Sequence, residues 1–122
     1  MFNVYGENQP KDFFIPDMIN KVKKKQKITI DKSVRDFIHV GEVSNIINFV
    51  IKKNIFSIVN AGSGKGLSLK YIISKISKKI NMKPVVIVNK TISKIVADMS
   101  FLRLSGYKPK KNINGHFNLK IR

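Results

Sequence analysis

The chain has 122 residues and a formal net charge of +17, and 43% of its residues are hydrophobic. This length suits one small domain with a modest core, and the apolar content excludes wholesale disorder. The absence of cysteine excludes a disulfide framework and a thiolate metal site, and His39 and His116 lack metal-ligand spacing, so no metal is predicted. No apolar run is long enough for a membrane helix, and the first residues lack a signal-peptide pattern, which predicts a cytoplasmic protein with no membrane partner.

The positive charge comes mainly from lysine, and only Lys23, Lys24, Lys25 and Lys27 form a tight cluster. Such an excess of cations favours polyanions as partners. Lysine, isoleucine and asparagine are all abundant, as drift in an AT-rich genome produces, whereas nucleic-acid binders usually interleave arginine and aromatic residues on a basic face. The composition therefore disfavours nucleic acid as the partner and keeps a small lysine-rich nucleic-acid-binding protein as an alternative.

Helical spacing and short β-branched runs alternate along the first half of the chain. They predict, in order, a helix from residue 15 to about 25, a strand at 27–30, a turn at 31–33, an extended stretch at 35–40 and a helix that begins after Gly41. In the extended stretch RDFIHV, Arg35, Phe37 and His39 share one face because side chains alternate along a strand. The nearly continuous apolar run at 55–60 predicts a strand covered on both faces.

The second half follows a glycine-rich turn. We predict a helix there with Ser68 as N-cap and a buried face running to Ile80, followed by a strand at 85–88. A polar connection then leads to an apolar segment at 95–97. A short helix follows, with Asp98 or Ser100 as cap and Gly106 at its end. The elements lack a regular βαβ alternation. We therefore predict an α/β fold of α+β-like character, with three to four helices and short strands.

The stretch NAGSGKG at residues 60–66 has the outline of a phosphate-binding loop, because it joins a β-branched run to a helix and carries Lys65 among glycines. A P-loop requires G-x-x-x-x-G-K-[ST]; here the first glycine position holds Val59, and Gly66 replaces the hydroxyl residue. The dinucleotide pattern G-x-G-x-x-G fails at Leu67. We therefore predict a structural turn whose glycines serve folding.

Three segments together resemble a known family. FNVYGENQ at 2–9, RDFIHV at 35–40 and VNAGSGKGLSLKYII at 59–73 are similar to the NAD-dependent epimerase/dehydratase family, the extended short-chain dehydrogenases that act on nucleotide sugars. The stretch ADMSFLRLSGYKP at 97–109 is similar to the family's D-x-S-K-A…L-G-W-x-P ending. The resemblance covers residues 1–110 and implies the C-terminal substrate-binding part of the fold, followed by a tail at 111–122.

The resemblance also shows what this sequence lacks. The family's G-x-x-G-x-x-G loop for NAD and its catalytic Tyr-x-x-x-Lys lie upstream of the part seen here. The pair Tyr71/Lys75 fits Y-x-x-x-K, but it lies where the family has no catalytic role, so we assign no catalytic and no cofactor-binding residue. The resemblance implies that a missing N-terminal half binds NAD and that this chain alone is inactive. A fragment, a subunit that joins a separate Rossmann half, and a non-functional remnant all stay open, as does an oligomer.

By resemblance, Asn3 and Arg35 are the candidate substrate-binding residues, and they would grip the diphosphate of a nucleotide sugar such as a UDP-sugar. A planar guanidinium can pair two phosphate oxygens, and an amide can donate to a third. The alternatives are a turn residue at position 3 and an ion pair of Arg35 with Asp31 or Asp36. NKTISKI replaces the family's R-x-G-D, so a second phosphate-binding arginine is not predicted. Epimerisation and dehydration both stay open.

Overall fold

A computed structural model describes residues 2–109, and the predicted tail at 111–122 lies outside the described residues. In chain order the elements are β1 (Asn3–Tyr5), α1 (Phe14–Lys23), β2 (Ile28–Ile30), β3 (Val34–His39), α2 (Val40–Lys52), β4 (Gly66–Ser68), α3 (Leu69–Ile80), β5 (Val86–Val88), β6 (Lys94–Ile95) and α4 (Ser100–Leu104). The predicted α/β class, with its helices and short strands, is confirmed. Among the described helices, none combines the length and the apolar character needed to cross a membrane.

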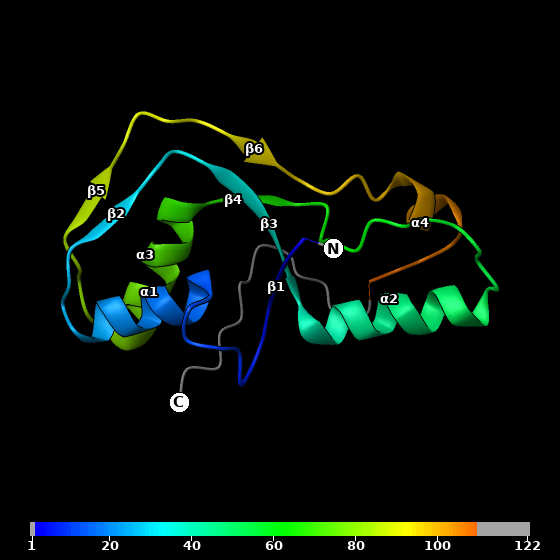
Figure 1. Ribbon diagram of the computed structural model, residues 1–122, viewed down its shortest axis with the longest axis horizontal. Coiled ribbons are helices and arrows are strands. Elements are labelled where there is room, and N and C mark those ends of the chain that lie inside the picture. Colours follow the sequence, from blue (N-terminus) through cyan, green and yellow to red (C-terminus); the bar gives the residue numbers. More distant parts are fainter. Residues whose placement is uncertain (1, 110–122) are drawn as a thin grey trace.

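The molecule has two lobes on either side of a small sheet (Figure 1). The α1/α3 lobe contains these two helices with β2 and β5, and the α2/α4 lobe contains the other two helices. In the sheet between them, β3 pairs in parallel with β1 and β6 and antiparallel with β4. The register places Asn3 opposite Phe37, and Leu67 opposite Arg35. Strands β2 and β5 form a separate parallel pair.

Strand β3 separates two hydrophobic clusters, because consecutive side chains of a strand point to opposite faces. Phe37 belongs to the first cluster, which α1 and α3 complete. Ile38 belongs to the second cluster, which α2 and α4 complete. The buried residues of the first cluster are Tyr5, Ile15, Met18, Val22, Ile28, Ile30, Phe37, Ile72, Ile73 and Ile76. Those of the second are Ile38, Val43, Ile46, Ala97, Met99, Leu102 and Tyr107.

Two predicted helix ends agree with the structure, and two do not: α4 has Met99 instead of Asp98 or Ser100 as N-cap, with no side-chain cap hydrogen bond, and α2 begins at Val40 instead of after Gly41. Ser68 Oγ accepts a hydrogen bond from the N–H of Tyr71 at 3.2 Å, which is the predicted N-cap of α3. At the end of α4, Gly106 has φ +92° and its N–H bonds to the carbonyl of Arg103, while the N–H of Tyr107 bonds to the carbonyl of Leu102. This pair of bonds is a Schellman motif, in which glycine provides the left-handed residue after the helix.

The strand predicted at 55–60 is wrong. These residues are assigned to no strand, and Phe56 and Ile58 are 96% and 98% exposed instead of covered. Val59 and Ala61 do pack against the second cluster, and the N–H of Phe2 donates to the carbonyl of Ala61 at 3.1 Å. An apolar run becomes a buried strand only where neighbours pair with it and cover it, and the described part of the chain does not supply them.

At residues 66–68 the prediction of a turn is also wrong, because the structure has the short strand β4 there. Its three residues pair with residues 34–36 of β3. The pairing is set by a partner strand about thirty residues earlier in the chain, which local sequence does not reveal.

Tyr107 and Glu42 form a buried polar contact within the second cluster. The Tyr107 hydroxyl donates to Glu42 Oε2 at 3.2 Å, and Asn45 Nδ2 donates to Glu42 Oε1 at 3.1 Å. The Tyr107 ring also lies edge-on to Phe49, with centroids 5.3 Å apart. Burial, and then the charge of Glu42, raise the pKa of Tyr107 to about 12.

Tyr107→Phe should keep the ring packing and remove the hydrogen bond, lowering the free energy of unfolding by about 1 kcal/mol at neutral pH. The pKa of Tyr107 rises from 10.0 to about 12 on folding. The hydroxyl therefore contributes its full stabilisation of the folded state at a pH below 10.0, and this stabilisation is lost as the pH rises through about 12. Denaturant unfolding from neutral to strongly alkaline pH should therefore show the gap between wild type and variant narrowing across that window. A constant gap would contradict this assignment.

Candidate functional site

The carboxylate of Asp36 anchors the glycine loop from inside the protein. Asp36 is fully buried, at 0% exposure, on the side of β3 that faces the second cluster. Its Oδ1 accepts the N–H of Ser63 at 2.8 Å and the Ser63 hydroxyl at 2.5 Å. Its Oδ2 accepts the N–H groups of Gly64 at 2.9 Å and Ala97 at 3.1 Å. The loop amides that would cradle a phosphate in a P-loop therefore hold an internal carboxylate.

Two glycines of the loop are required by its geometry. A Cβ at Gly62 would lie 2.3 Å from Ala97 Cβ and 2.9 Å from Asp36 Oδ2, so no side chain fits between the loop and its anchor. Gly64 has φ +71°, a backbone conformation that other residues adopt with strain. This geometry agrees with the prediction that the loop glycines serve folding.

Arg35 lies next to Asp36 on β3, and its side chain points to the opposite face of the sheet. The guanidinium is half-buried. Its Nη1 donates to the carbonyls of Val34 at 3.1 Å and Ser93 at 3.2 Å, and its Nη2 donates to the Ser93 hydroxyl at 2.7 Å. A guanidinium has five N–H donors, and the hydrogen bonds to described residues use three of them.

In the described part of the chain, the Arg35 guanidinium forms no ion pair. The alternative of an ion pair with Asp31 or Asp36 is therefore wrong. The Asp36 carboxylate is engaged by the glycine loop. Hydrogen bonds from Ser33, and only after them the charge of Arg35, hold the pKa of Asp31 below its ordinary value. Arg35 thus keeps a positive charge in a half-buried place, and such a charge favours an anionic ligand.

Asn3 is the first residue of β1, rather than a turn residue. Its Nδ2 donates to the backbone carbonyl of Asp36 at 2.9 Å, and the residue as a whole is exposed. The parallel register, with Asn3 opposite Phe37, puts Asn3 and Arg35 on adjacent strands and on the same face of the sheet. The structure therefore brings the two predicted residues into one region, and their role in substrate binding stays a prediction.

The roles of Asp36 as the loop anchor and of Ser93 as the partner of Arg35 were not predicted from the sequence. A carboxylate inside an apolar strand is a usable signal, because a buried charge needs hydrogen-bond partners. Ser93 gives no such signal. It lies 58 residues from Arg35 in a polar connection, and its hydroxyl also lies 2.8 Å from the hydroxyl of Ser33.

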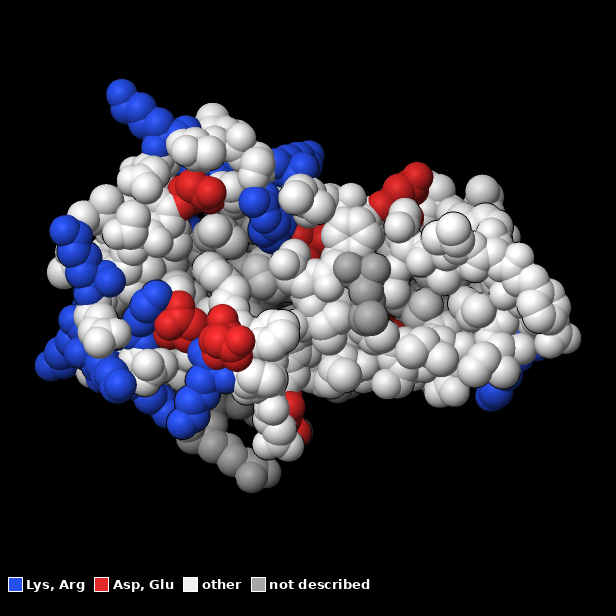
Figure 2. Space-filling view, viewed as in Figure 1, with Lys and Arg blue, Asp and Glu red and all other residues white. Residues whose placement is uncertain are grey.

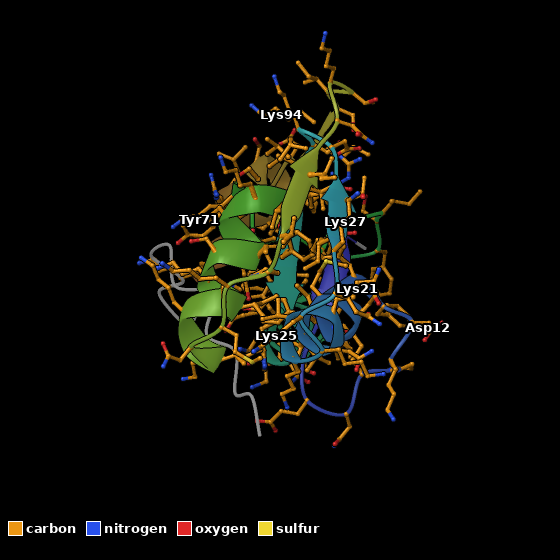
Figure 3. The ribbon with its side chains drawn as sticks, turned by 90° about the vertical axis from the view of Figure 1, so that its left-hand side faces the viewer. Asp12, Lys21, Lys25, Lys27, Tyr71 and Lys94 are labelled. Atoms are coloured by element: carbon orange, nitrogen blue, oxygen red, sulfur yellow. The ribbon has the colours of Figure 1, made fainter. Side chains whose placement is uncertain are left out.

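Tyr71 and Lys75, which fit Y-x-x-x-K, contact one another on α3. The Nζ of Lys75 lies 5.3 Å from the centroid of the Tyr71 ring, as in a cation–π pair one helical turn apart. Figure 3 shows Tyr71 projecting from the side of α3. In the region that the structure describes, no group of three or more His, Cys, Asp or Glu side chains could hold a metal ion.

Residues 1–62 match the NAD dependent epimerase/dehydratase family. The match covers half of the chain and includes two of the segments that carried the resemblance, FNVYGENQ and RDFIHV. The chain belongs to the NAD-dependent epimerase/dehydratase family. No curated protein sequence matches this family member.

Solved structures share the fold of this epimerase/dehydratase family member. The UDP-glucose 4-epimerase of Thermus thermophilus, in complex with NAD, has a TM-score of 0.70 at 21% identity and covers 89% of this chain and 40% of its own. The UDP-N-acetylglucosamine 4-epimerase of Methanobrevibacter ruminantium M1, in complex with UDP-N-acetylmuramic acid, has a TM-score of 0.72 at 24% identity. The match covers 91% of this chain and 39% of the epimerase. WbmG of Bordetella bronchiseptica, in complex with NAD, has a TM-score of 0.75 at 24% identity. The match covers 91% of this chain and 37% of WbmG. The chain thus spans about 40% of the length of the structures it matches.

Asp36→Asn tests the anchor of the loop. Each carboxylate oxygen faces its own donors, so the amide –NH₂ would meet N–H groups in either orientation. We expect the free energy of unfolding to fall by about 3 kcal/mol, as for other buried charge-assisted hydrogen bonds. Denaturant unfolding measures this loss. Asp98→Asn is the matched control, because Asp98 is exposed and accepts from Ser100 through Oδ1 alone; equal losses in the two variants would refute the anchor.

Gly62→Ala should destabilise the protein by more than the roughly 1 kcal/mol of an ordinary glycine change, because its Cβ would overlap Ala97. Thermal and denaturant unfolding measure the effect. Gly41→Ala is the control, since Gly41 is exposed in the first turn of α2 and the closest approach of its Cβ to His39 would be 3.2 Å, at Nδ1. A Gly62→Ala protein as stable as the parent would contradict the close packing of the loop.

Proposed function

We propose that this chain is the substrate-binding portion of a cytoplasmic NAD-dependent nucleotide-sugar epimerase or dehydratase, and that it grips the nucleotide diphosphate. One observation carries the proposal: the half-buried guanidinium of Arg35 forms no ion pair within residues 2–109 and keeps unused donors. A nucleotide diphosphate offers adjacent anionic oxygens that match a planar fork. Asn3, on the adjacent strand, is the second contact in this proposal.

The hydrogen bonds of Arg35 support this role. Ser93 holds the guanidinium through its carbonyl and its hydroxyl, and Ser33 lies against that hydroxyl. A side chain fixed before binding loses less conformational freedom when the ligand arrives, and affinity rises accordingly. Structural relatives were solved in complex with UDP-glucose and with UDP-N-acetylmuramic acid, which supports a UDP-sugar as the substrate class.

NAD does not fit the residues described in this chain. Its diphosphate would need the free amides of a glycine loop, and the amides of Ser63 and Gly64 already bond to the Asp36 carboxylate. We therefore place the NAD site in the part of the fold that this chain does not span. The relatives in complex with NAD, at about 40% coverage of their chains, support this division.

The arrangement of the lysines does not support nucleic-acid binding, which is the alternative function. Blue side chains gather on the α1/α3 lobe in Figure 2. In the end-on view of Figure 3 the labelled lysines lie well apart, with Lys94 of β6 at the top, Lys27 just before β2 below it, and Lys21 and Lys25 lower in the view. A nucleic-acid site concentrates its cations along one face, so this distribution favours a solvated lobe.

Arg35→Ala should weaken the binding of UDP and UDP-glucose by about 10- to 100-fold, the usual cost of losing hydrogen bonds to a charged group. Arg35→Lys should recover only part of the loss, because lysine keeps the charge without the fork. Calorimetric titration of the chain with each ligand measures the affinity, and circular dichroism confirms that each variant is folded.

Two controls separate binding from folding. Arg103→Ala removes an exposed arginine of α4 and should leave nucleotide affinity unchanged. Ser93→Ala removes one partner of Arg35 while the guanidinium remains, so it should weaken UDP binding less than Arg35→Ala does. If folded Arg35→Ala bound UDP as tightly as the parent, Arg35 would be structural and the proposed function would fail.

A further inference from the structure

The turn between β2 and β3 lies alongside the connection from β5 to β6 (Figure 1). The N–H of Lys32 donates to the carbonyl of Thr91 at 2.9 Å, and the N–H of Val34 donates to the carbonyl of Ser93 at 2.8 Å. These two bonds continue the parallel pairing of β2 with β5 into that of β3 with β6. They hold the hydroxyl oxygens of Ser33 and Ser93 only 2.8 Å apart, although the two residues are 60 positions apart in the sequence.

Asp31 and Arg35 lie at the two ends of a chain of hydrogen bonds that passes through these hydroxyls. Asp31 Oδ1 accepts the N–H of Ser33 at 2.8 Å, and the Ser33 hydroxyl also hydrogen-bonds to the Asp31 carboxylate. At the other end, Arg35 Nη2 donates to Ser93 Oγ at 2.7 Å. Ser33 is fully buried, at 0% exposure, so its hydroxyl depends on these protein partners in place of water.

The chemistry of the two ends fixes the direction of each hydrogen bond in the chain. A guanidinium only donates and an ionised carboxylate only accepts, whereas a serine hydroxyl has a single hydrogen to donate. The hydrogen of Ser33 is therefore directed at Asp31, and that of Ser93 is directed at Ser33. Ser93 Oγ then offers its lone pairs to Arg35 Nη2. The negative charge of Asp31 polarises both hydroxyls in this direction and strengthens the hydrogen bond that Arg35 donates.

The pKa of Asp31 agrees with this direction. Hydrogen bonds from the Ser33 hydroxyl and from the Ser33 N–H are the largest causes that lower this pKa, and the charge of Arg35 lowers it further. The ionised carboxylate is therefore the form that the surrounding donors favour, and it is the form that can only accept.

We propose that Asp31 is a positioning residue for the Arg35 guanidinium and acts through the hydroxyls of Ser33 and Ser93. This role rests on the proposed function and deepens it, because it explains how one arginine presents its remaining donors to a diphosphate in a fixed orientation. The carbonyls of Val34 and Ser93 hold Nη1, and the chain of hydroxyls holds Nη2. Both arms of the fork are thus held before a ligand arrives, which reduces the conformational freedom lost on binding.

Asp31→Ala separates positioning from simple electrostatics by the direction of its effect. If charge alone mattered, removing a carboxylate near the site of an anionic ligand would tighten binding. Loss of positioning weakens binding instead. We expect the affinity for UDP to fall by about 2- to 10-fold, as for one side chain that must be ordered on binding. Calorimetric titration of the chain with UDP measures the affinity, and circular dichroism confirms that the variant is folded.

Two further variants complete the comparison. Asp98→Ala is the matched control, because Asp98 accepts both the N–H and the hydroxyl of Ser100, as Asp31 does from Ser33. It removes the same kind of turn and the same charge, and UDP affinity should stay unchanged. Ser33→Ala breaks the chain at its centre without changing any charge, and the smaller alanine fits the buried position. It should weaken UDP binding about as much as Asp31→Ala.

A double-mutant cycle tests whether Asp31 acts through the hydroxyls. In the Ser93→Ala protein the chain is already broken, so adding Asp31→Ala should cause no further loss of UDP affinity. An equal loss in the two backgrounds would overturn the proposal. Folded Asp31→Ala that bound UDP as tightly as the parent, or more tightly, would overturn it as well.

A measurement without ligand distinguishes failure of this proposal from failure of the proposed function. Nuclear magnetic resonance of the ¹⁵N-labelled chain reports how fast the Arg35 guanidinium rotates about its Nε–Cζ bond. Rotation should be faster in Asp31→Ala than in the parent, whereas rotation of the exposed Arg103 should not change. Faster rotation in a chain that does not bind UDP would count against the proposed function alone. Equal rotation of Arg35 in the parent and the variant would overturn the positioning role.

Discussion

The structure depends on one buried charge. The carboxylate of Asp36 has no contact with solvent and receives hydrogen bonds from Ser63, Gly64 and Ala97. It therefore joins β3 to the glycine loop and to the segment that leads into α4. Removing a charge from water is costly unless donors replace the water, and the loop provides them. The glycines are required because any larger residue at Gly62 would separate the loop from this anchor.

Successive side chains of β3 point to opposite faces of the sheet, so the residues on each face have different roles. Asp36 and Ile38 face the second cluster, where one anchors the loop and the other fills the core. Arg35 and Phe37 face the other way, so the positive charge of Arg35 lies on the opposite side of the sheet from the Asp36 carboxylate. This separation keeps the Arg35 guanidinium and the Asp36 carboxylate from forming an ion pair. Ser93 then fixes the orientation of the guanidinium.

The two lobes differ in what they present to their surroundings. The α1/α3 lobe is covered by lysines and has a complete cluster beneath them. The α2/α4 lobe buries one side of its elements and leaves large apolar side chains on the other. Exposed apolar side chains therefore distinguish the α2/α4 lobe from the lysine-covered α1/α3 lobe.

The sequence by itself determined the features that depend on neighbours within one or two helical turns. The helix after Ser68, its N-cap and the glycine that ends α4 follow from side-chain spacing and capping chemistry. The segments FNVYGENQ, RDFIHV and VNAGSGKGLSLKYII together indicated the family. Only the tertiary structure decided the contacts between distant segments. Residues 55–60 have the composition of a buried strand, but strand formation requires a neighbouring strand, and β4 formed instead where β3 was available. In the same way, Ser93 became the partner of Arg35 because folding brings β3 and β6 side by side. The secondary-structure propensity of a segment depends on its own residues. Strand pairing and side-chain burial depend on distant residues, which lie together only in the folded chain.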